Sequence, residues 1–314
     1  MHDVTIFGAG PTANNCFDVL SRKGLRVSRT LDFDPDDSRP LIIGEASGAY
    51  QTTRQAAEAG RHMLIASQQA LSPERLMPLL QNRRPWQAIF VWSERRYHPG
   101  YRLIGGLTET DATWRPRFLR SETLSTEPSS ATLFRLHAME AIGLVIGIAA
   151  AEPERVAAHA SAYTKRNTFD LLNLEVTFPE LQAFIQVGLG EAIERRETLL
   201  ASDTRKAYVD ELDLTAPGRL VDNDPAIGES RRSQRWLSCH SPSSDELVRK
   251  QCFAFLDATL KPWLAEEEAT RWRRALDVLA AMQRSLDTNG TSVTVEEPDE
   301  VPGHYLRLVV QDAA

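Results

Sequence analysis

The feature that most constrains this chain is a glycine-rich turn close to its N-terminus. A β-branched and aromatic run, Val4–Phe7, leads into Gly8-Ala9-Gly10-Pro11-Thr12-Ala13, which opens a predicted helix. Gly8 permits the tight strand-to-helix turn, Gly10 lets the backbone approach a diphosphate, and Ala13 lets the helix pack closely on its strand. Free N–H groups at the helix start then face the anion. The pattern predicts a Rossmann-like domain, with dinucleotide-binding residues Gly8, Gly10, Pro11, Thr12 and Ala13.

An acidic residue follows the second predicted strand at a spacing that suits a nucleotide. The strand Leu25–Leu31 ends at Asp32, which lies 24 residues after Gly8. A carboxylate there accepts hydrogen bonds from the adenosine ribose and disfavours a 2′-phosphate, which favours NADH. Arg29 and Arg39 lie nearby and argue for NADPH, so both cofactors stay open. The alternative is a glycine-rich turn in an α/β domain that holds no nucleotide.

The connection after this strand is unusually short. Only six residues, Pro35–Pro40, separate Asp34 from the next predicted strand, Leu41–Ile43. A complete crossover helix needs about a dozen residues or more. We therefore expect an abbreviated nucleotide-binding half with an altered adenosine pocket.

Composition excludes several classes of partner. Lys and Arg number 36 against 43 Asp and Glu, a net charge of −7, which argues against a nucleic-acid-binding protein. The three cysteines are far apart in sequence, so neither a disulfide framework nor a metal site is expected. The start of the chain lacks a basic, apolar leader, and the apolar stretch Ala138–Ala151 is too short to span a bilayer. These observations predict a soluble cytoplasmic protein that acts on a small molecule and binds no membrane.

The middle and end of the chain resemble a known family. The segment Ala57-Glu58-Ala59-Gly60-Arg61-His62 is similar to the helix end of the Gfo/Idh/MocA oxidoreductases, and Ser243–Leu260, Glu266–Leu286 and Thr291–Val295 are similar to their helix–helix–strand ending. The resemblance implies an α/β fold with a Rossmann-like domain at 1–112 and a second α/β domain at 113–314. The second domain is expected to hold a largely antiparallel open sheet, whose open face implies a homodimer. Two of its strands are predicted at Leu172–Phe178 and Leu181–Leu189, and a last strand at Tyr305–Val310.

The resemblance also assigns candidate site residues. Ser67 falls on the family's lysine position and is expected beside the cofactor, while Leu133 falls on its aspartate position and His137 on its histidine position. A serine hydroxyl does not replace a cation, so the family's polyol dehydrogenase chemistry is disfavoured. For His137 the alternative is a core histidine on an apolar helix.

A loop after the predicted strand Gln87–Trp92 carries Tyr97 and His98. It resembles the loop of the thiazolinyl imine reductases, a branch of the family in which a tyrosine and a histidine are proposed proton donors. For Tyr97 the alternative is packing under a helix. We therefore predict a reductase that uses NADPH or NADH on a C=N or C=O group in specialised metabolite biosynthesis, with Tyr97, His98 and His137 as catalytic residues. The alternative is a degenerate pseudo-enzyme that binds a dinucleotide, a metabolite, or a carrier or other partner protein.

Overall fold

The computed structural model describes residues 3–93, 95–102, 104, 114–128, 130–163, 169–213, 215, 217–222, 234–236 and 242–296. The chain forms two compact units. The first contains residues 1–97 and 242–273, and the second contains residues 98–241 and 274–314. The division at residue 112 that the sequence predicted is wrong for residues 242–273, which pack with the first unit.

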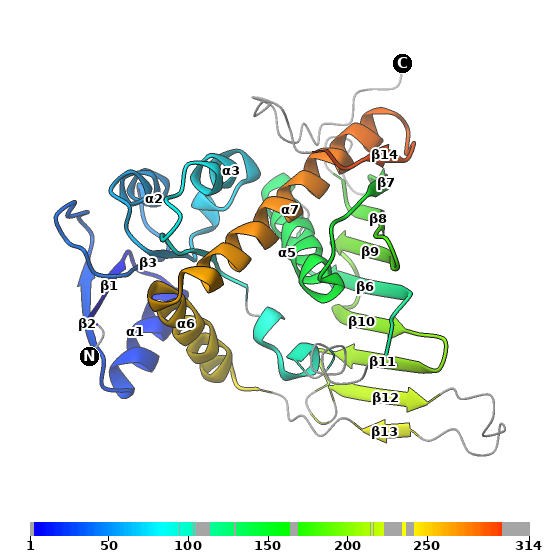
Figure 1. Cartoon of the computed structure of the whole chain (residues 1–314), viewed down its shortest axis with the longest axis horizontal. Coiled ribbons are helices and arrows are strands. Elements are labelled where there is room, and N and C mark those ends of the chain that lie inside the picture. The colour runs from blue at the N-terminus through cyan, green and yellow to red at the C-terminus, as the bar shows by residue number, and fades with distance from the viewer. Residues whose placement is uncertain are drawn as a thin grey trace. The chain divides into compact units, whose positions relative to one another are not determined.

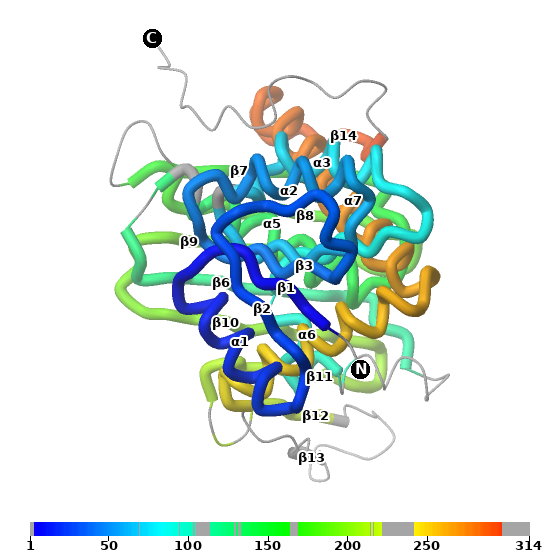
Figure 2. The backbone as a smooth tube through the Cα atoms, turned by 90° about the vertical axis from the view of Figure 1, so that its left-hand side faces the viewer, coloured from blue at the N-terminus to red at the C-terminus, as the bar shows by residue number. Residues whose placement is uncertain are grey.

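The first unit is built on a parallel sheet with the strand order β2-β1-β3-β4-β5. Figure 2 shows β1 between β2 and β3. The strands β3, β4 and β5 are short and entirely buried, as is typical of a parallel sheet covered on both faces. The elements are β1 (Asp3–Phe7), α1 (Pro11–Arg22), β2 (Arg26–Thr30), β3 (Leu41–Ile43), α2 (Ala49–Glu58), β4 (Met63–Ile65), η1 (Gln68–Ala70), α3 (Pro73–Gln81), β5 (Ile89–Val91) and η2 (Arg95–Tyr97).

Helices cover both faces of this sheet. On one face, α1 and α6 (Ser244–Leu260) pack together over the strands, with Cys16, Phe90 and Phe255 in their shared core. Figure 1 shows α2 and α3 on the opposite face. The Ser243 hydroxyl accepts a hydrogen bond from the Glu246 N–H at 3.2 Å, so Ser243 caps α6. Contact with α1 explains why α6 belongs to the first unit.

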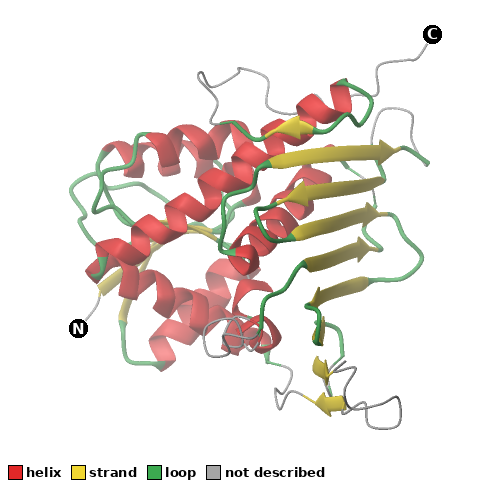
Figure 3. Cartoon of the chain, turned by 45° about the vertical axis from the view of Figure 1, so that its right-hand side comes forward, coloured by secondary structure: helices red, strands yellow, loops and turns green. Residues whose placement is uncertain are grey.

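The second unit is built on a nine-stranded sheet with the order β13-β12-β11-β10-β6-β9-β8-β7-β14. Figure 3 draws its strands in yellow. The pair β6–β9 is parallel and the other neighbouring pairs are antiparallel. Helix α5 (Ala131–Ala149) packs on β6 and β9, and α7 (Pro262–Asp287) runs from the first unit into the second. The strands are β6 (Phe118–Ser125), β7 (Arg155–Ser161), β8 (Leu171–Thr177), β9 (Gln182–Leu189), β10 (Arg195–Ala201), β11 (Arg205–Asp210), β12 (Gly218–Asp222), β13 (Gln234–Trp236) and β14 (Val293–Thr294).

The predicted fold class, a Rossmann-like unit followed by a largely antiparallel open sheet, is confirmed. The strands predicted at Leu172–Phe178 and Leu181–Leu189 are present as β8 and β9, with Thr177 opposite Gln182 beside the turn. The predicted last strand, Tyr305–Val310, lies outside the described residues. Within the ranges that the structure describes, no helix has the length and apolar composition needed to cross a membrane.

Candidate functional site

The glycine-rich turn lies at the carboxyl end of β1 and requires glycine at two positions. Gly8 and Gly10 have φ angles of 96° and 93°, in the left-handed region that other residues rarely adopt. A Cβ atom on Gly8 would lie 2.9 Å from the carbonyl oxygen of Glu45. That same oxygen accepts a hydrogen bond from the Ala9 N–H at 2.9 Å. The turn is therefore held against the segment that follows β3.

The first turn of α1 presents backbone donors beside these glycines. Gly10 is the N-cap residue, Pro11 occupies the first turn, and no side-chain hydrogen bond caps the helix. Ala13 is fully buried, and a Cβ atom on Gly44 would lie only 2.7 Å from the Ala13 Cβ, so α1 starts in close contact with the segment after β3. The Thr12 and Ala13 N–H groups belong to the helix start, where the helix dipole favours an anion.

The turn also lies at the position where a parallel sheet binds nucleotides. Strand β1 pairs with β2 on one side and with β3 on the other, so the strand order reverses at β1. Dinucleotides bind in doubly wound folds at this switch point, with the diphosphate on the start of the first helix. The five predicted residues therefore form one turn whose geometry fits a diphosphate: Gly8, Gly10, Pro11, Thr12 and Ala13.

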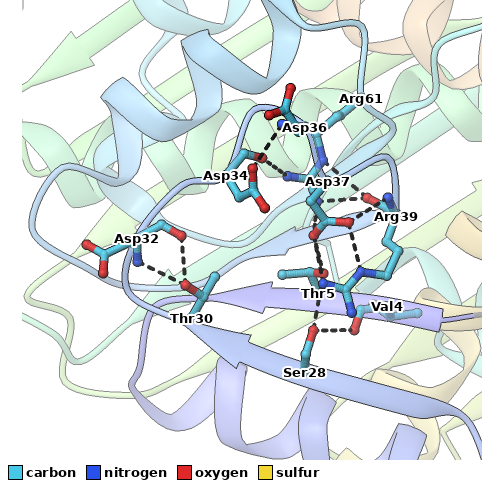
Figure 4. A network of polar contacts seen from close by, with 10 residues as sticks. All are labelled: Val4, Thr5, Ser28, Thr30, Asp32, Asp34, Asp36, Asp37, Arg39 and Arg61. Atoms are coloured by element: carbon cyan, nitrogen blue, oxygen red, sulfur yellow. Dashed lines mark hydrogen bonds and ion pairs between the residues drawn. The ribbon is translucent and has the colours of Figure 1, made fainter.

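The short connection from β2 to β3 is confirmed, and one carboxylate anchors it. Asp37 accepts hydrogen bonds from Thr5 Oγ1 at 2.8 Å, from Arg39 Nε at 2.8 Å and from Arg61 Nη2 at 3.1 Å (Figure 4). Burial alone would raise the pKa of Asp37, but the hydrogen bonds from Arg39 and Thr5 and the charge of Arg61 outweigh it, so the pKa is well below its usual range. The connection is thus fixed to the middle of β1.

Asp32 lies on the same connection, just beyond β2. Its side chain is exposed and lies apart from the Asp37 cluster in Figure 4, and its N–H donates to Thr30 Oγ1 at 3.0 Å. Asp32 also helps to line a cavity of about 160 Å³ beside the connection.

The two arginines near Asp32 are engaged elsewhere. Arg29 donates to Asn14 Oδ1 at 2.8 Å, and its guanidinium lies 4.5 Å from the centre of the Phe17 ring. Arg39 binds Asp37 through two of its nitrogens. Both guanidinium groups are thus paired within the first unit.

Ser67 lies two residues beyond β4 and is fully buried. Its hydroxyl donates to Glu45 Oε2 at 3.2 Å, and the Gln68 N–H donates to Glu45 Oε1 at 2.6 Å. Glu45 was not among the site residues that the sequence predicted. Its position two residues beyond the apolar strand β3 was the available signal, because the carboxyl ends of parallel strands meet at one edge of the sheet.

Tyr97 lies in a buried ion-pair cluster of the first unit, which also contains Arg96, Glu268 and Arg271. Burial raises the pKa of Tyr97 to about 12, although the charge of Arg96 opposes the change. A hydroxyl with this pKa is a weaker proton donor than an ordinary tyrosine. Glu268 accepts hydrogen bonds from Arg271 at 2.7 Å and from the Trp272 indole at 2.8 Å.

His98 follows Tyr97 in sequence but belongs to the second unit. Only 4% of its surface is exposed, and its Nδ1 accepts a hydrogen bond from the Gly100 N–H at 3.2 Å. The ring lies edge-on to Tyr101, with 5.9 Å between the ring centres. Since Nδ1 is the acceptor in this bond, any proton on the neutral ring lies on Nε2.

His137 projects from α5 and pairs with a carboxylate that the sequence did not indicate. Its Nε2 lies 3.3 Å from Glu127 Oε2, and 17% of its side chain is exposed. The Glu127 backbone is fixed at both ends, because its N–H donates to Ser125 Oγ at 3.2 Å and its carbonyl accepts from the Gly190 N–H at 2.8 Å. A histidine held by a carboxylate is an arrangement that general acid–base chemistry uses.

Several solved structures are similar to this chain in fold at low sequence identity, and their titles describe dehydrogenases or oxidoreductases. A levoglucosan dehydrogenase in complex with NADH matches with a TM-score of 0.73 at 14% identity, covering 94% of this chain and 99% of that one. The UDP-N-acetylglucosamine 3-dehydrogenase GnnA from Acidithiobacillus ferrooxidans matches with a TM-score of 0.70 at 17% identity, covering 91% and 99%. A putative NADPH-dependent oxidoreductase from Desulfitobacterium hafniense matches with a TM-score of 0.73 at 13% identity, covering 94% and 97%. No family model and no curated protein matches the sequence.

The parallel first sheet, the glycine-rich turn at its switch point and the open second sheet define an α/β protein with a Rossmann-type first unit. This is the fold of the Gfo/Idh/MocA oxidoreductases, and the resemblance that the sequence indicated is confirmed for the fold.

Proposed function

We propose that the protein is an NAD(P)-dependent oxidoreductase that acts on a small molecule. The observation that carries this proposal is the turn of Gly8 and Gly10 at the switch point, which leads into a helix start without a side-chain cap. The names of the similar structures support it, since one holds NADH and another is called NADPH-dependent. The residues that would hold the diphosphate are Gly8, Gly10, Thr12 and Ala13.

Of the two cofactors, we propose NADH. An exposed carboxylate at the end of β2 suits the ribose hydroxyls of adenosine and repels a 2′-phosphate. The nearby arginines that would bind such a phosphate, Arg29 and Arg39, are paired with Asn14 and Asp37. Binding NADPH would require one of them to leave its partner.

The proposed reaction is the reduction of a C=O or C=N group. A bound NADH supplies the hydride, and the protein supplies the proton that the oxygen or nitrogen takes up. His137 is the best-supported proton donor, because it is partly exposed and its Nε2 lies 3.3 Å from Glu127 Oε2. An imine or thiazoline-like substrate in specialised metabolite biosynthesis remains our finer proposal, since reduction of C=N needs one modest acid only.

A second candidate function is a dinucleotide- or metabolite-binding protein without catalysis, which recognises a carrier or other partner protein. Two observations favour it: Ser67 is fully buried at the position assigned to the family lysine, and the pKa of Tyr97 is about 12. This second candidate would bind NADH at the same site as the proposed oxidoreductase, but it would not convert a substrate.

Self-association through the open face of the nine-stranded sheet is also part of the proposal. On that face the Phe118 and Phe184 rings lie 5.5 Å apart, and 38% of Phe184 is exposed. If this face forms a homodimer, the Phe184→Asp variant is a monomer by light scattering while the unchanged protein is a dimer. A monomeric unchanged protein refutes the homodimer.

The proposed function is tested by titrating NADH and NADPH against the fluorescence of the six tryptophans. We expect saturable binding of NADH at least tenfold tighter than that of NADPH, and Asp32→Asn is expected to reduce this preference. If neither cofactor binds, the oxidoreductase proposal fails. If NADH binds, His137→Asn separates the two candidates once a substrate is in hand, because it lowers kcat in an enzyme.

A further inference from the structure

Glu45 bridges three loops at the edge of the first sheet where the strands end. Its carbonyl oxygen accepts from Ala9, in the loop after β1. Its carboxylate accepts from the Ser67 hydroxyl at 3.2 Å and from the Gln68 N–H at 2.6 Å, both in the loop after β4. Glu45 itself stands in the loop after β3. The carboxylate is therefore fixed in position by the protein.

The Glu45 side chain starts beside the glycine turn. A Cβ atom on Gly10 would lie 3.5 Å from the Glu45 Cβ and 3.9 Å from its Cγ, which is ordinary van der Waals contact. A carboxylate on a side chain that starts beside this turn repels a bound diphosphate. Its presence in a diphosphate site is best explained if a different part of the same ligand donates hydrogen bonds to it.

The placement indicates which part that is. Asp32 stands beyond β2, on the adenosine side of the switch point, whereas Glu45 stands between β3 and β4 on the other side of β1. A dinucleotide that crosses the switch point therefore brings its second nucleoside to the Glu45 side. A carboxylate offers about four acceptor sites, and the two donors from Ser67 and Gln68 leave room for a ribose diol.

We propose that Glu45 recognises the second ribose of the dinucleotide, the one that carries nicotinamide, by accepting hydrogen bonds from its hydroxyl groups. The inference rests on the proposed function, because it assigns a role within the same dinucleotide site. Ser67 and Gln68 act as positioning residues that orient the carboxylate. Ligands with a second ribose then gain affinity from Glu45, whereas ligands that end at the diphosphate do not.

The test measures the affinities of ADP, ADP-ribose and NADH for the full chain by calorimetry, without any need for a substrate. ADP lacks the second ribose, and ADP-ribose has it without nicotinamide. We expect Glu45→Gln to reduce the affinity ratio of NADH to ADP about tenfold, and that of ADP-ribose to ADP by a similar factor, because hydrogen bonds to a charged acceptor are lost. Ser67→Ala, which removes one group that orients the carboxylate, is expected to reduce both ratios about threefold.

Glu58→Gln is the matched control. It removes the same charge from the same unit, at a side chain that is 67% exposed on α2, and is expected to leave both ratios unchanged. Unliganded thermal unfolding verifies that each variant folds, and Ser67→Ala tests the proposal if Glu45→Gln does not fold. Equal changes for all three ligands, or tighter binding of all three, would overturn the role of Glu45 and leave the proposed function standing. Failure of the unchanged protein to bind any of the three refutes the proposed function itself.

Discussion

Replacing Asp37 is expected to destabilise the first unit more than any exposed substitution nearby. The Asp37 side chain is 9% exposed and that of its partner Arg61 is 4% exposed, so Asp37→Ala leaves a buried cation without its carboxylate. Such a loss costs about 3–5 kcal/mol. Arg61 keeps hydrogen bonds to the carbonyl oxygens of Asp34 and Arg39, at 3.2 and 2.9 Å, so we expect the lower end, about 3 kcal/mol. Asp37→Asn retains one acceptor and is expected to cost about 1–2 kcal/mol.

The pH dependence follows from the lowered pKa of Asp37. A carboxyl group whose pKa is lower in the folded state stabilises the fold fully above its unfolded pKa, about 3.9, and loses that contribution as the pH falls towards its folded pKa. The difference in unfolding free energy between the unchanged protein and Asp37→Ala is therefore expected to be about 0.7 kcal/mol smaller at pH 3.5 than at pH 6.5.

Urea unfolding followed by tryptophan fluorescence measures both quantities. The control is Asp36→Asn, which removes the charge of an exposed neighbouring residue and is expected to change stability by less than about 0.5 kcal/mol. A cost below about 1 kcal/mol for Asp37→Ala, or a difference that grows in acid, would refute the role of Asp37 as the anchor of the connection. Because Asp32 lies on this connection, weaker NADH binding is expected in the same variant.

Three further predictions concern the first unit. Gly8→Ala is expected to abolish NADH binding and to lower the unfolding temperature more than Gly24→Ala does. Both glycines have a positive φ, but of the two only a Cβ on Gly8 would lie within 4 Å of backbone atoms. Equal effects of the two variants in thermal unfolding would contradict the contact of Gly8 with Glu45. Glu268→Gln is expected to lower the free energy of unfolding by about 3–5 kcal/mol at neutral pH. Burial raises the pKa of Glu268, but the charges of Arg271 and Arg96 outweigh it and hold this pKa at about 2. Urea titrations should therefore show a smaller loss at pH 3 than at pH 7. In a Cys239→Ser background, Cys16 and Cys252 are expected to react with a thiol reagent only when the protein unfolds. Contact with Cys16 and burial raise the pKa of the Cys252 thiol, which disfavours the reactive thiolate. Reaction of these thiols faster than unfolding would contradict the prediction.

Local signals in the sequence were sufficient for much of the first unit. The glycines of the first turn act within a few residues, so their spacing alone predicted the turn. Strands β10 to β12 carry many charged side chains, which hide the period-two pattern. Arg195 of β10, for example, forms an ion pair with Glu122 of the neighbouring strand β6 at 3.0 Å, and this pairing accommodates its charge in the sheet.

The contacts that complete the candidate site come from residues distant in sequence. Glu45 meets Ser67 only because β3 and β4 are neighbours in the sheet, and Glu127 meets His137 only because the chain turns before α5. The sequence placed Tyr97 in a suitable loop, but it did not reveal that Glu268 and two arginines surround it. Such contacts depend on packing between elements, which residue spacing does not determine.

The discontinuity of the first unit has a consequence for how the chain folds during synthesis. Cys16 on α1 and Cys252 on α6 lie 3.7 Å apart at their sulfur atoms, although 236 positions separate them along the chain. The apolar face of α1 therefore stays exposed on the ribosome until α6 has left the exit tunnel, after residues 98–241 of the second unit have emerged. A fragment that stops at residue 112 is expected to aggregate, and supplying residues 242–273 as a separate peptide is the natural way to rescue it.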